Sequence, residues 1–154
     1  MIALRPIVAQ DQEAFQAFVR ELSPESRINR FLMPVRELAP AVLTALTQPD
    51  QASHVGLVAT EDARIIGEGR YVARADGSRG EFAIAVTDRW QRRGIGTRLL
   101  AALTAAAHRA GIAALEGEIL RTNMAMLKFV LSAAFRLRIC PGDGTLTIAE
   151  RLLA

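Results

Sequence analysis

Hydrophobic and polar positions repeat with two different periods along the chain, and the change of period marks where the type of element changes. A short alternating segment, "IALRPIV" at residues 2–8, predicts a strand. Apolar positions then recur every three or four residues in 11–22, 23–34 and about 39–48, which predicts amphipathic helices. Asp11 and Ser23 stand where the first two helices need an N-cap. From residue 54 to residue 86 the period is two, which predicts three antiparallel strands with turns at 61–63 and 75–80.

The second half of the chain alternates between helical and extended patterns. A helix is predicted from residue 94 to about 110, with Gly111 as its stop, and a strand follows at 113–120. Asn123 begins a helix that continues to about 134, and two closing strands are predicted at 135–140 and 145–153. This order predicts an α+β fold with a mixed, mostly antiparallel central sheet of about seven strands flanked by about four to five helices.

Composition narrows the class of protein. With 154 residues, 51% hydrophobic and 23% charged, the chain is expected to form a single domain over residues 1–154. Charged residues interrupt every apolar run well before about 20 residues, and the start "MIALRPIVAQDQ" lacks the order of an export signal, so we expect no membrane span and no leader. The single Cys140 and the absence of Cys/His ligand spacing predict a cytoplasmic protein without a metal. Dispersed arginines and only eight aromatic residues argue against nucleic-acid binding.

The stretch "TDRWQRRGIGTRLL", residues 87–100, carries the first candidate chemistry. It joins a predicted strand end to a predicted helix start, where unpaired backbone N–H groups and the helix dipole favour an anion. Gly94 and Gly96 remove side chains from the approach to the backbone, and Gln91, Arg92 and Arg93 add hydrogen-bond donors. The third glycine of the dinucleotide fingerprint and the Lys-Ser/Thr ending of an ATP-binding loop are both missing. A pyrophosphate of another kind is expected; the alternative is a strain-relieving turn with solvated arginines.

Residues 91–96, "QRRGIG", resemble the Gln/Arg-x-x-Gly-x-Gly/Ala pyrophosphate loop of the GNAT superfamily of N-acyltransferases, which bind acetyl-CoA. The resemblance extends over residues 65–135, and "LSPESRINRFL", "GRYVAR" and "EFAIAV" are similar to the catalytic domain of bacterial Pat-type protein lysine acetyltransferases. It implies acetyl-CoA as co-substrate and a primary amine, here a protein lysine, as acceptor. Similar proteins are commonly homodimers. The residues that it implies for donor binding are Ile84, Ala85 and Val86 through their backbone, Gln91, Arg92, Arg93, Gly94, Ile95, Gly96, Thr97, Asn123 and Met126.

Glu81 is the candidate general base. A lysine amine has a pKa of about 10.4 and is almost wholly protonated at neutral pH, so a base that removes its proton is useful. Glu81 begins the strand that leads to the loop, and on a regular strand it shares a face with Ala83 and Ala85, whose small side chains leave room for a ligand. The resemblance to Pat-type enzymes also places their catalytic glutamate here. The alternative is a solvated carboxylate at a strand end.

One position departs from the family pattern. Many GNAT enzymes carry a tyrosine seven residues after the asparagine matched by Asn123 and use it to protonate the departing thiolate, but this chain has Val130 there. Its only tyrosine, Tyr71, lies on another predicted strand and is expected to be structural. The thiolate therefore leaves unassisted or takes its proton from water.

Several polar residues have more than one interpretation. Arg27 and Arg30 either line the acceptor cleft or form a solvated helix face. His54 and His108 lack partners at triad spacing and are not expected to act in the reaction. Cys140, near the end of a predicted strand, is expected to be a small apolar residue rather than an acyl-carrying nucleophile. Two other functions stay open, a small-molecule amine N-acetyltransferase and a catalytically weak acyl-CoA-binding sensor module.

Overall fold

The structure is a computed structural model that describes residues 1–153. Within these residues the chain forms seven strands, five α-helices and two short 3₁₀ helices. In chain order they are β1 (Ile2–Pro6), η1 (Ala9–Asp11), α1 (Gln12–Glu21), α2 (Pro24–Phe31), α3 (Pro40–Thr47), β2 (His54–Glu61), β3 (Arg64–Ala73), β4 (Arg79–Val86), η2 (Asp88–Trp90), α4 (Ile95–Arg109), β5 (Ala114–Leu120), α5 (Met124–Ser132), β6 (Arg136–Ile139) and β7 (Leu146–Leu152). The predicted α+β fold is confirmed.

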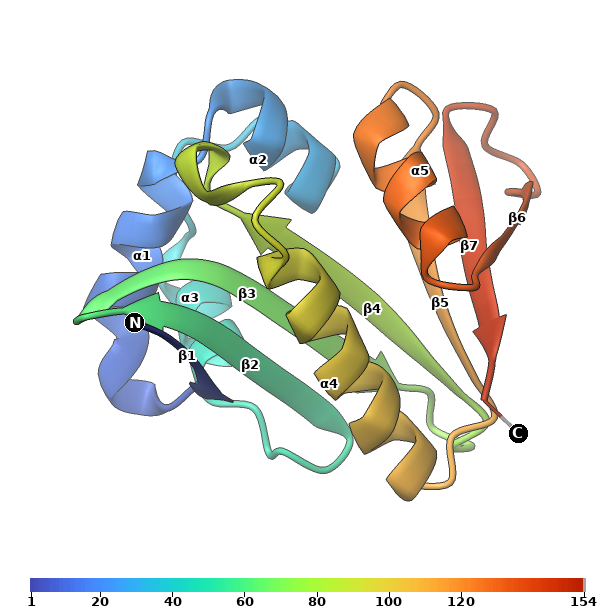
Figure 1. Cartoon of the computed structure of the whole chain (residues 1–154), viewed down its shortest axis with the longest axis horizontal. Coiled ribbons are helices and arrows are strands. Elements are labelled where there is room, and N and C mark those ends of the chain that lie inside the picture. Colours follow the sequence, from blue (N-terminus) through green and yellow to red (C-terminus); the bar gives the residue numbers. More distant parts are fainter. Residues whose placement is uncertain (154) are drawn as a thin grey trace.

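All seven strands form one sheet in the order β1-β2-β3-β4-β5-β7-β6. Every neighbouring pair is antiparallel except β4 and β5, which run parallel. The parallel pairing covers only three positions, from Arg79 opposite Ala114 to Glu81 opposite Glu116. Beyond these positions β4 and β5 diverge, so that the sheet opens into a fork (Figure 1).

The fork begins where an aromatic ring meets a glycine. Phe82 follows the last β4 residue that pairs with β5, and its Cε1 atom lies 2.8 Å from the position that a Cβ on Gly117 would occupy. The ring is 8% exposed and packs against Phe135, with 5.1 Å between ring centroids. The missing side chain at Gly117 therefore lets the Phe82 ring lie against β5 at the point where the strands separate.

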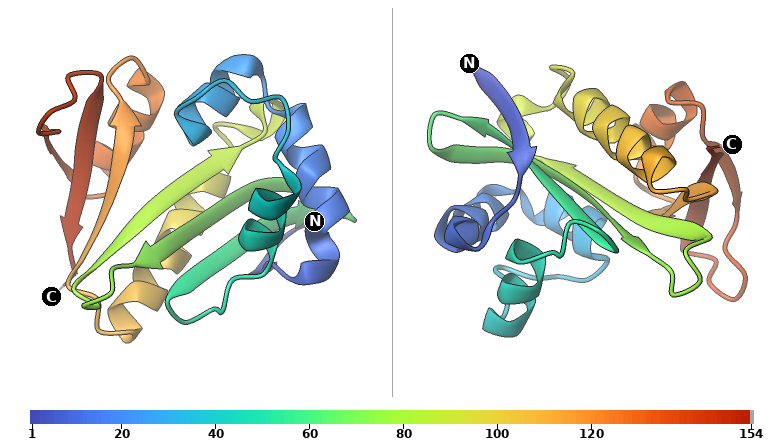
Figure 2. Two further views of the ribbon diagram at one scale, coloured as in Figure 1. Left: turned by 180° about the vertical axis from the view of Figure 1, so that it is seen from behind. Right: turned by 90° about the horizontal axis from the view of Figure 1, so that it is seen from below.

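Helices cover both faces of the sheet (Figure 2). On one face α4 packs its apolar stripe, including Leu99 and Leu103, against Ile84 and the neighbouring strands. On the other face α1 buries Phe15 and Phe18. Tyr71 is only 1% exposed within the α4-side core, which agrees with a structural role. No helix within residues 1–153 combines the length and apolarity needed to cross a membrane.

Two of the three predicted helix caps are confirmed. The Ser23 hydroxyl accepts a hydrogen bond from the Ser26 backbone N–H at 3.1 Å, and Asn123 Oδ1 accepts one from the Met126 N–H at 3.2 Å. These bonds satisfy donors that a helix start otherwise leaves unpaired. Helix α2 ends at Phe31, three residues before the predicted end, where the following residue turns into the left-handed region.

Asp11 stands at the predicted N-cap position of α1, but the prediction that its side chain caps this helix is wrong. Asp11 precedes α1, but its carboxylate makes no capping bond. It forms a paired contact with the Arg5 guanidinium, 2.8 Å at each oxygen, and accepts a bond from the Val8 N–H. The Arg5 hydrogen bonds are the main cause that holds the pKa of Asp11 below its ordinary value. A bidentate pair with arginine thus replaces the cap.

Candidate active site

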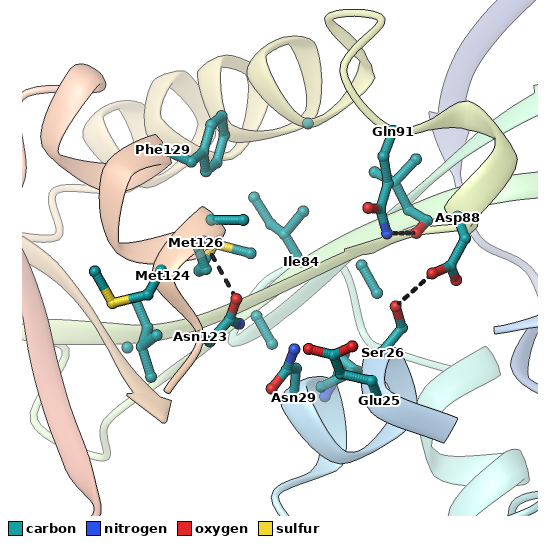
Figure 3. A pocket seen from close by; sticks show the side chains of 18 of the residues that line it. Glu25, Ser26, Asn29, Ile84, Asp88, Gln91, Asn123, Met124, Met126 and Phe129 are labelled. Atoms are coloured by element: carbon teal, nitrogen blue, oxygen red, sulfur yellow. Dashed lines mark hydrogen bonds between the residues drawn. The ribbon is translucent and has the colours of Figure 1, made fainter. Parts of the chain in front are cut away.

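A cavity of about 570 Å³ opens in the fork between β4 and β5 (Figure 3). Helix α2 forms one wall, α5 forms the opposite wall, and the loop into α4 closes a third side. The lining residues are Glu25, Ser26, Asn29 and Arg30 of α2; Phe82, Ala83, Ile84, Ala85 and Val86 of β4; Asp88, Trp90, Gln91, Arg92, Gly94, Gly96 and Thr97 of the loop and α4; and Gly117, Glu118, Ile119, Thr122, Asn123, Met124, Ala125, Met126 and Phe129.

The strand β4 presents a free edge to this cavity. Residues 82–86 pair with β3 on one side, but among the described residues they have no strand partner on the β5 side. The Val86 carbonyl instead accepts a bond from the Gln91 side chain at 3.0 Å. Backbone groups at an open strand edge can pair with an extended ligand that carries amides. Ile84, Ala85 and Val86 all line the cavity, as the expected backbone contact with pantetheine requires.

The loop places a helix N-terminus at the cavity. Gly94 is the N-cap of α4 with a φ of 83°, a conformation in which glycine avoids the strain of a Cβ. Arg92 also has a positive φ, 63°, which is unfavourable for a residue with a side chain and is typical of functional loops. No side chain caps the N-terminus of α4 within the described chain, and Gly96 and Thr97 line the cavity. The first turn therefore has N–H groups available for an anion.

Most of the predicted donor-binding residues meet at this cavity, but two side chains do not. The Arg93 guanidinium lies over the Trp90 ring, 4.8 Å from its centroid, and Arg93 does not line the cavity. The Ile95 side chain is 1% exposed and belongs to the core beneath α4. Ile95 could contribute to an anion site only through its backbone. The predicted residues that line the cavity are Ile84, Ala85, Val86, Gln91, Arg92, Gly94, Gly96, Thr97, Asn123 and Met126.

Glu81 lies at the closed end of the fork rather than in the cavity wall. It is the last residue of β4 that pairs with β5, opposite Glu116, and its side chain is 61% exposed. The nearest cation is Arg74, whose Nη2 atom is 3.9 Å from a Glu81 oxygen. Ala83, on the same face of β4, does line the cavity. Glu81 is therefore next to the cavity along the strand, and its role as general base stays a prediction.

A buried ion-pair network lies behind helix α2. The Glu68 carboxylate has no exposed surface, and it contacts Arg30 Nε at 2.5 Å and Arg70 Nε at 2.9 Å. Burial alone would raise the pKa of Glu68, but the charges and hydrogen bonds of both arginines outweigh it and hold this pKa below its ordinary value. Arg30 lines the cavity, whereas Arg27 donates to the carbonyl oxygen of Leu22. The cleft interpretation therefore fits Arg30 and not Arg27.

The residues set aside in the sequence analysis lie away from the cavity wall. His54 is half-buried, with its ring 3.0 Å from Arg70 Nη1, and burial followed by the Arg70 charge lowers its pKa. Val130 is fully buried in the core. His108 is exposed on α4, and Cys140 follows β6. Within residues 1–153, no three His, Cys, Asp or Glu side chains are grouped so that they could hold a metal ion.

Sequence reasoning missed several lining residues. Glu25, Ser26 and Asn29 were not singled out, because the helical pattern of residues 23–34 does not tell which element the helix will face. Asp88 and Trp90 were missed because a three-residue 3₁₀ helix leaves no periodic pattern. Glu118 on β5 had a possible signal: its strand alternates, and it lies two residues after Glu116 on the same face.

The forked sheet, the free edge of β4 and the loop at the start of α4 meet at one cavity, and the comparisons with known proteins identify this arrangement. The family described as "Acetyltransferase (GNAT) domain" matches residues 52–135, more than half of the chain. The chain belongs to this family of acetyltransferases.

Comparison with individual proteins agrees with this membership. An acetyltransferase of Pseudomonas aeruginosa is 29% identical over 151 residues, which cover 96% of this chain and 81% of that protein. Acetyltransferase Pat of Mycolicibacterium smegmatis is 35% identical over 130 residues, or 82% of this chain, but the match spans only 39% of that longer protein. The crystal structure of the GNAT domain of S. lividans PAT superposes with a TM-score of 0.91 at 29% identity, covering 97% of this chain and 89% of that one.

The different placement of the two loop arginines leads to a prediction for donor binding. Arg92→Ala is expected to weaken acetyl-CoA binding by about tenfold or more, because Arg92 lines the cavity, where a guanidinium is placed to donate hydrogen bonds to a phosphate. Arg93→Ala should weaken it by less than about threefold, because its guanidinium lies over Trp90. Isothermal titration calorimetry at two salt concentrations measures the Kd for acetyl-CoA of both variants. Equal losses, or a larger loss for Arg93→Ala, would contradict this assignment.

Proposed function

We propose that this acetyltransferase transfers the acetyl group of acetyl-CoA to a primary amine, specifically a protein lysine side chain, with Glu81 as general base. The observation that carries the proposal is the cavity in the strand fork. The cavity has a proposed anion-binding loop on one side and carboxylates on other walls, and Glu81 lies beside it along β4, at the closed end of the fork. A cytoplasmic location is part of the proposal, because the chain's single cysteine indicates no disulfide chemistry.

The donor half of the cavity fits acetyl-CoA. The free edge of β4 offers backbone groups to the amides of pantetheine, and the start of α4 with Arg92 offers donors to the pyrophosphate. Met126 and Phe129 add apolar surface on the α5 wall. When bound, acetyl-CoA supplies an acetyl group activated as a thioester. These features support donor binding along the fork, with the acetyl group directed toward its closed end.

The acceptor half fits a cation. Glu25 on α2 and Glu118 on β5 line the cavity, and neither forms an ion pair with another side chain in residues 1–153. Carboxylates near a cavity attract an ammonium group and raise its local concentration. A lysine side chain arrives as an ammonium ion at neutral pH. The resemblance of the sequence to Pat-type protein lysine acetyltransferases supports a protein lysine over a small amine, and two of the similar proteins carry the name Pat.

In the proposed reaction Glu81 takes a proton from the lysine ammonium group. The neutral nitrogen then forms a bond with the acetyl carbonyl carbon while the carbon–sulfur bond breaks, and the sulfur leaves with the electron pair. The acylated nitrogen, which is now positively charged, loses its second proton to water and becomes the neutral amide. Val130 offers no proton to the thiolate, so it leaves unassisted or is protonated by water. Holding the amine against the thioester contributes through proximity, and the base contributes by keeping the nitrogen nucleophilic.

The test of the acceptor class is a panel of amines assayed under one set of conditions. Lysine-containing peptides, polyamines, aminoglycosides and free amino acids are each incubated with acetyl-CoA, and CoA release is corrected for hydrolysis while mass spectrometry locates the acetyl group. We expect kcat/KM for peptide lysines to exceed that of every small amine by about tenfold or more. Preference for a small amine would overturn the acceptor assignment. Binding of acetyl-CoA with no release above hydrolysis would favour the sensor alternative.

A further inference from the structure

Helix α2 forms the acceptor-side wall of the cavity and meets the hydrophobic core through its last residue, the partly buried Phe31. None of its side chains is buried, and its apolar Ile28 is 38% exposed. A helix of eight residues gains too little from its own hydrogen bonds to be stable by itself, and most helices depend on a buried apolar face. Packing through Phe31 leaves most of α2 without apolar support, so further contacts must help to hold the helix in place.

Polar contacts at both ends of α2 supplement that packing. At the C-terminal end Arg30 contacts the buried Glu68 carboxylate. At the N-terminal end the Asp88 carboxylate accepts two hydrogen bonds, one from the Ser23 backbone N–H at 3.0 Å and one from the Ser26 hydroxyl at 3.2 Å. Figure 3 shows Ser26 and Asp88 directed toward each other at the edge of the cavity. A negative charge at this position also interacts favourably with the helix dipole.

Asp88 belongs to the donor side of the site. It is the first residue of η2, and the Gln91 N–H that begins the anion-binding loop lies 3.4 Å from the Asp88 carbonyl oxygen. The residue before it, Thr87, is buried and bonded through its backbone N–H to the Ile66 carbonyl, which fixes the start of η2 on β3. Asp88 is therefore joined to the donor loop through its backbone and to the acceptor wall through its side chain.

The carboxylate of Asp88 carries a charge at neutral pH. Burial acts to raise its pKa, but the hydrogen bonds from Ser23 and Ser26 outweigh burial and hold this pKa below its ordinary value. The charge strengthens both bonds to α2. Asp143 is a useful contrast, because its carboxylate accepts hydrogen bonds from the backbone N–H and the hydroxyl of Thr145, which belongs to the same turn.

We propose that Asp88 is a positioning residue that holds helix α2, the acceptor-side wall, at a fixed distance from the donor-binding loop. This inference rests on the proposed function for the identity of the two substrates. The contact joins segments 65 residues apart in the chain. Its loss should leave the donor loop and core intact but let α2, with Glu25 and Asn29, move away from the acceptor.

Two measurements on the full chain test this role. Hydrogen–deuterium exchange of the α2 amides needs no acceptor, so it stays informative even if the amine proves to be of another class. In Asp88→Ala we expect exchange in α2 to rise about fivefold, while α4 keeps its wild-type rate. With the amine that turns over fastest, the acceptor KM should rise about fivefold or more, while the Kd for acetyl-CoA changes by less than about twofold.

Matched variants separate positioning from general damage. Asp88→Asn keeps one oxygen acceptor and should show a smaller increase in both α2 exchange and acceptor KM than Asp88→Ala. Asp143→Ala removes a comparable turn carboxylate that does not line the cavity and should change neither quantity. Wild-type exchange of α2 in Asp88→Ala would overturn the positioning role. So would a rise in the Kd for acetyl-CoA that matches the rise in acceptor KM.

Discussion

Glu81→Gln is expected to lower kcat by about 100-fold or more and to leave the Kd for acetyl-CoA nearly unchanged, since a positioned general base contributes about 10²–10⁴-fold. Glu81 lies at the closed end of the fork, outside the cavity wall that would hold the donor. Steady-state kinetics and calorimetry measure the two quantities. The deficit should shrink as the pH approaches about 10, because the lysine amine then loses its proton without help.

Glu118→Gln is the matched control for the base. Glu118 is an exposed carboxylate that lines the same cavity on the opposite strand, and the substitution is the same. We expect it to raise the acceptor KM by less than about tenfold and to leave kcat within about threefold, because it removes attraction for the ammonium group but no proton acceptor. A 100-fold loss of kcat in Glu118→Gln with normal turnover in Glu81→Gln would transfer the role of base to Glu118.

Glu68→Gln is expected to lower the free energy of unfolding by about 3–5 kcal/mol, because it leaves the buried charge of Arg70 without its partner. Arg70 is 4% exposed, and its Nη2 atom has no hydrogen-bond partner in residues 1–153. Urea denaturation at pH 7 measures the change. Glu13→Gln, at an exposed position on α1, is the control and should stay within about 0.5 kcal/mol of wild type.

The pH dependence gives the Glu68 prediction a second readout. The pKa of Glu68 is lowered in the folded state. The charge of Glu68 therefore adds to the free energy of unfolding above its unfolded-state pKa of about 4.3, and this contribution is lost as the pH falls through its folded-state pKa. The difference between wild type and Glu68→Gln should therefore shrink on acidification. A double variant, Glu68→Gln with Arg70→Gln, should recover part of the loss. A difference that stays constant from pH 7 to pH 3 would show that packing, not charge, explains the effect.

The order of the helices and strands, and the position of the donor loop between β4 and α4, were predictable from local sequence patterns. The period of two over residues 54–86 corresponds to β2, β3 and β4, because alternating side chains face a core on one side of a strand. The helix start at Gly94 and the cap at Asn123 are also as expected. Each of these features depends on residues that are neighbours in the chain.

The acceptor side of the site was not predictable in the same way. Helix α2 is placed by contacts between Ser23 and Asp88 and between Arg30 and Glu68, which join residues 65 and 38 positions apart. No periodicity encodes such pairs. Glu81 shows the same limit: its face on β4 was predicted from alternation, but its position short of the cavity depends on how far β4 and β5 remain paired.

The free edge of β4 has a consequence for how the enzyme responds to its own product. Among the cavity features, those proposed to bind the donor contact pantetheine and pyrophosphate, which are the same in acetyl-CoA and in the CoA that remains after transfer. Only the small acetyl group distinguishes them. On the proposed function, CoA therefore competes with acetyl-CoA for the fork, and the rate of acetylation follows the ratio of the two rather than the concentration of acetyl-CoA alone.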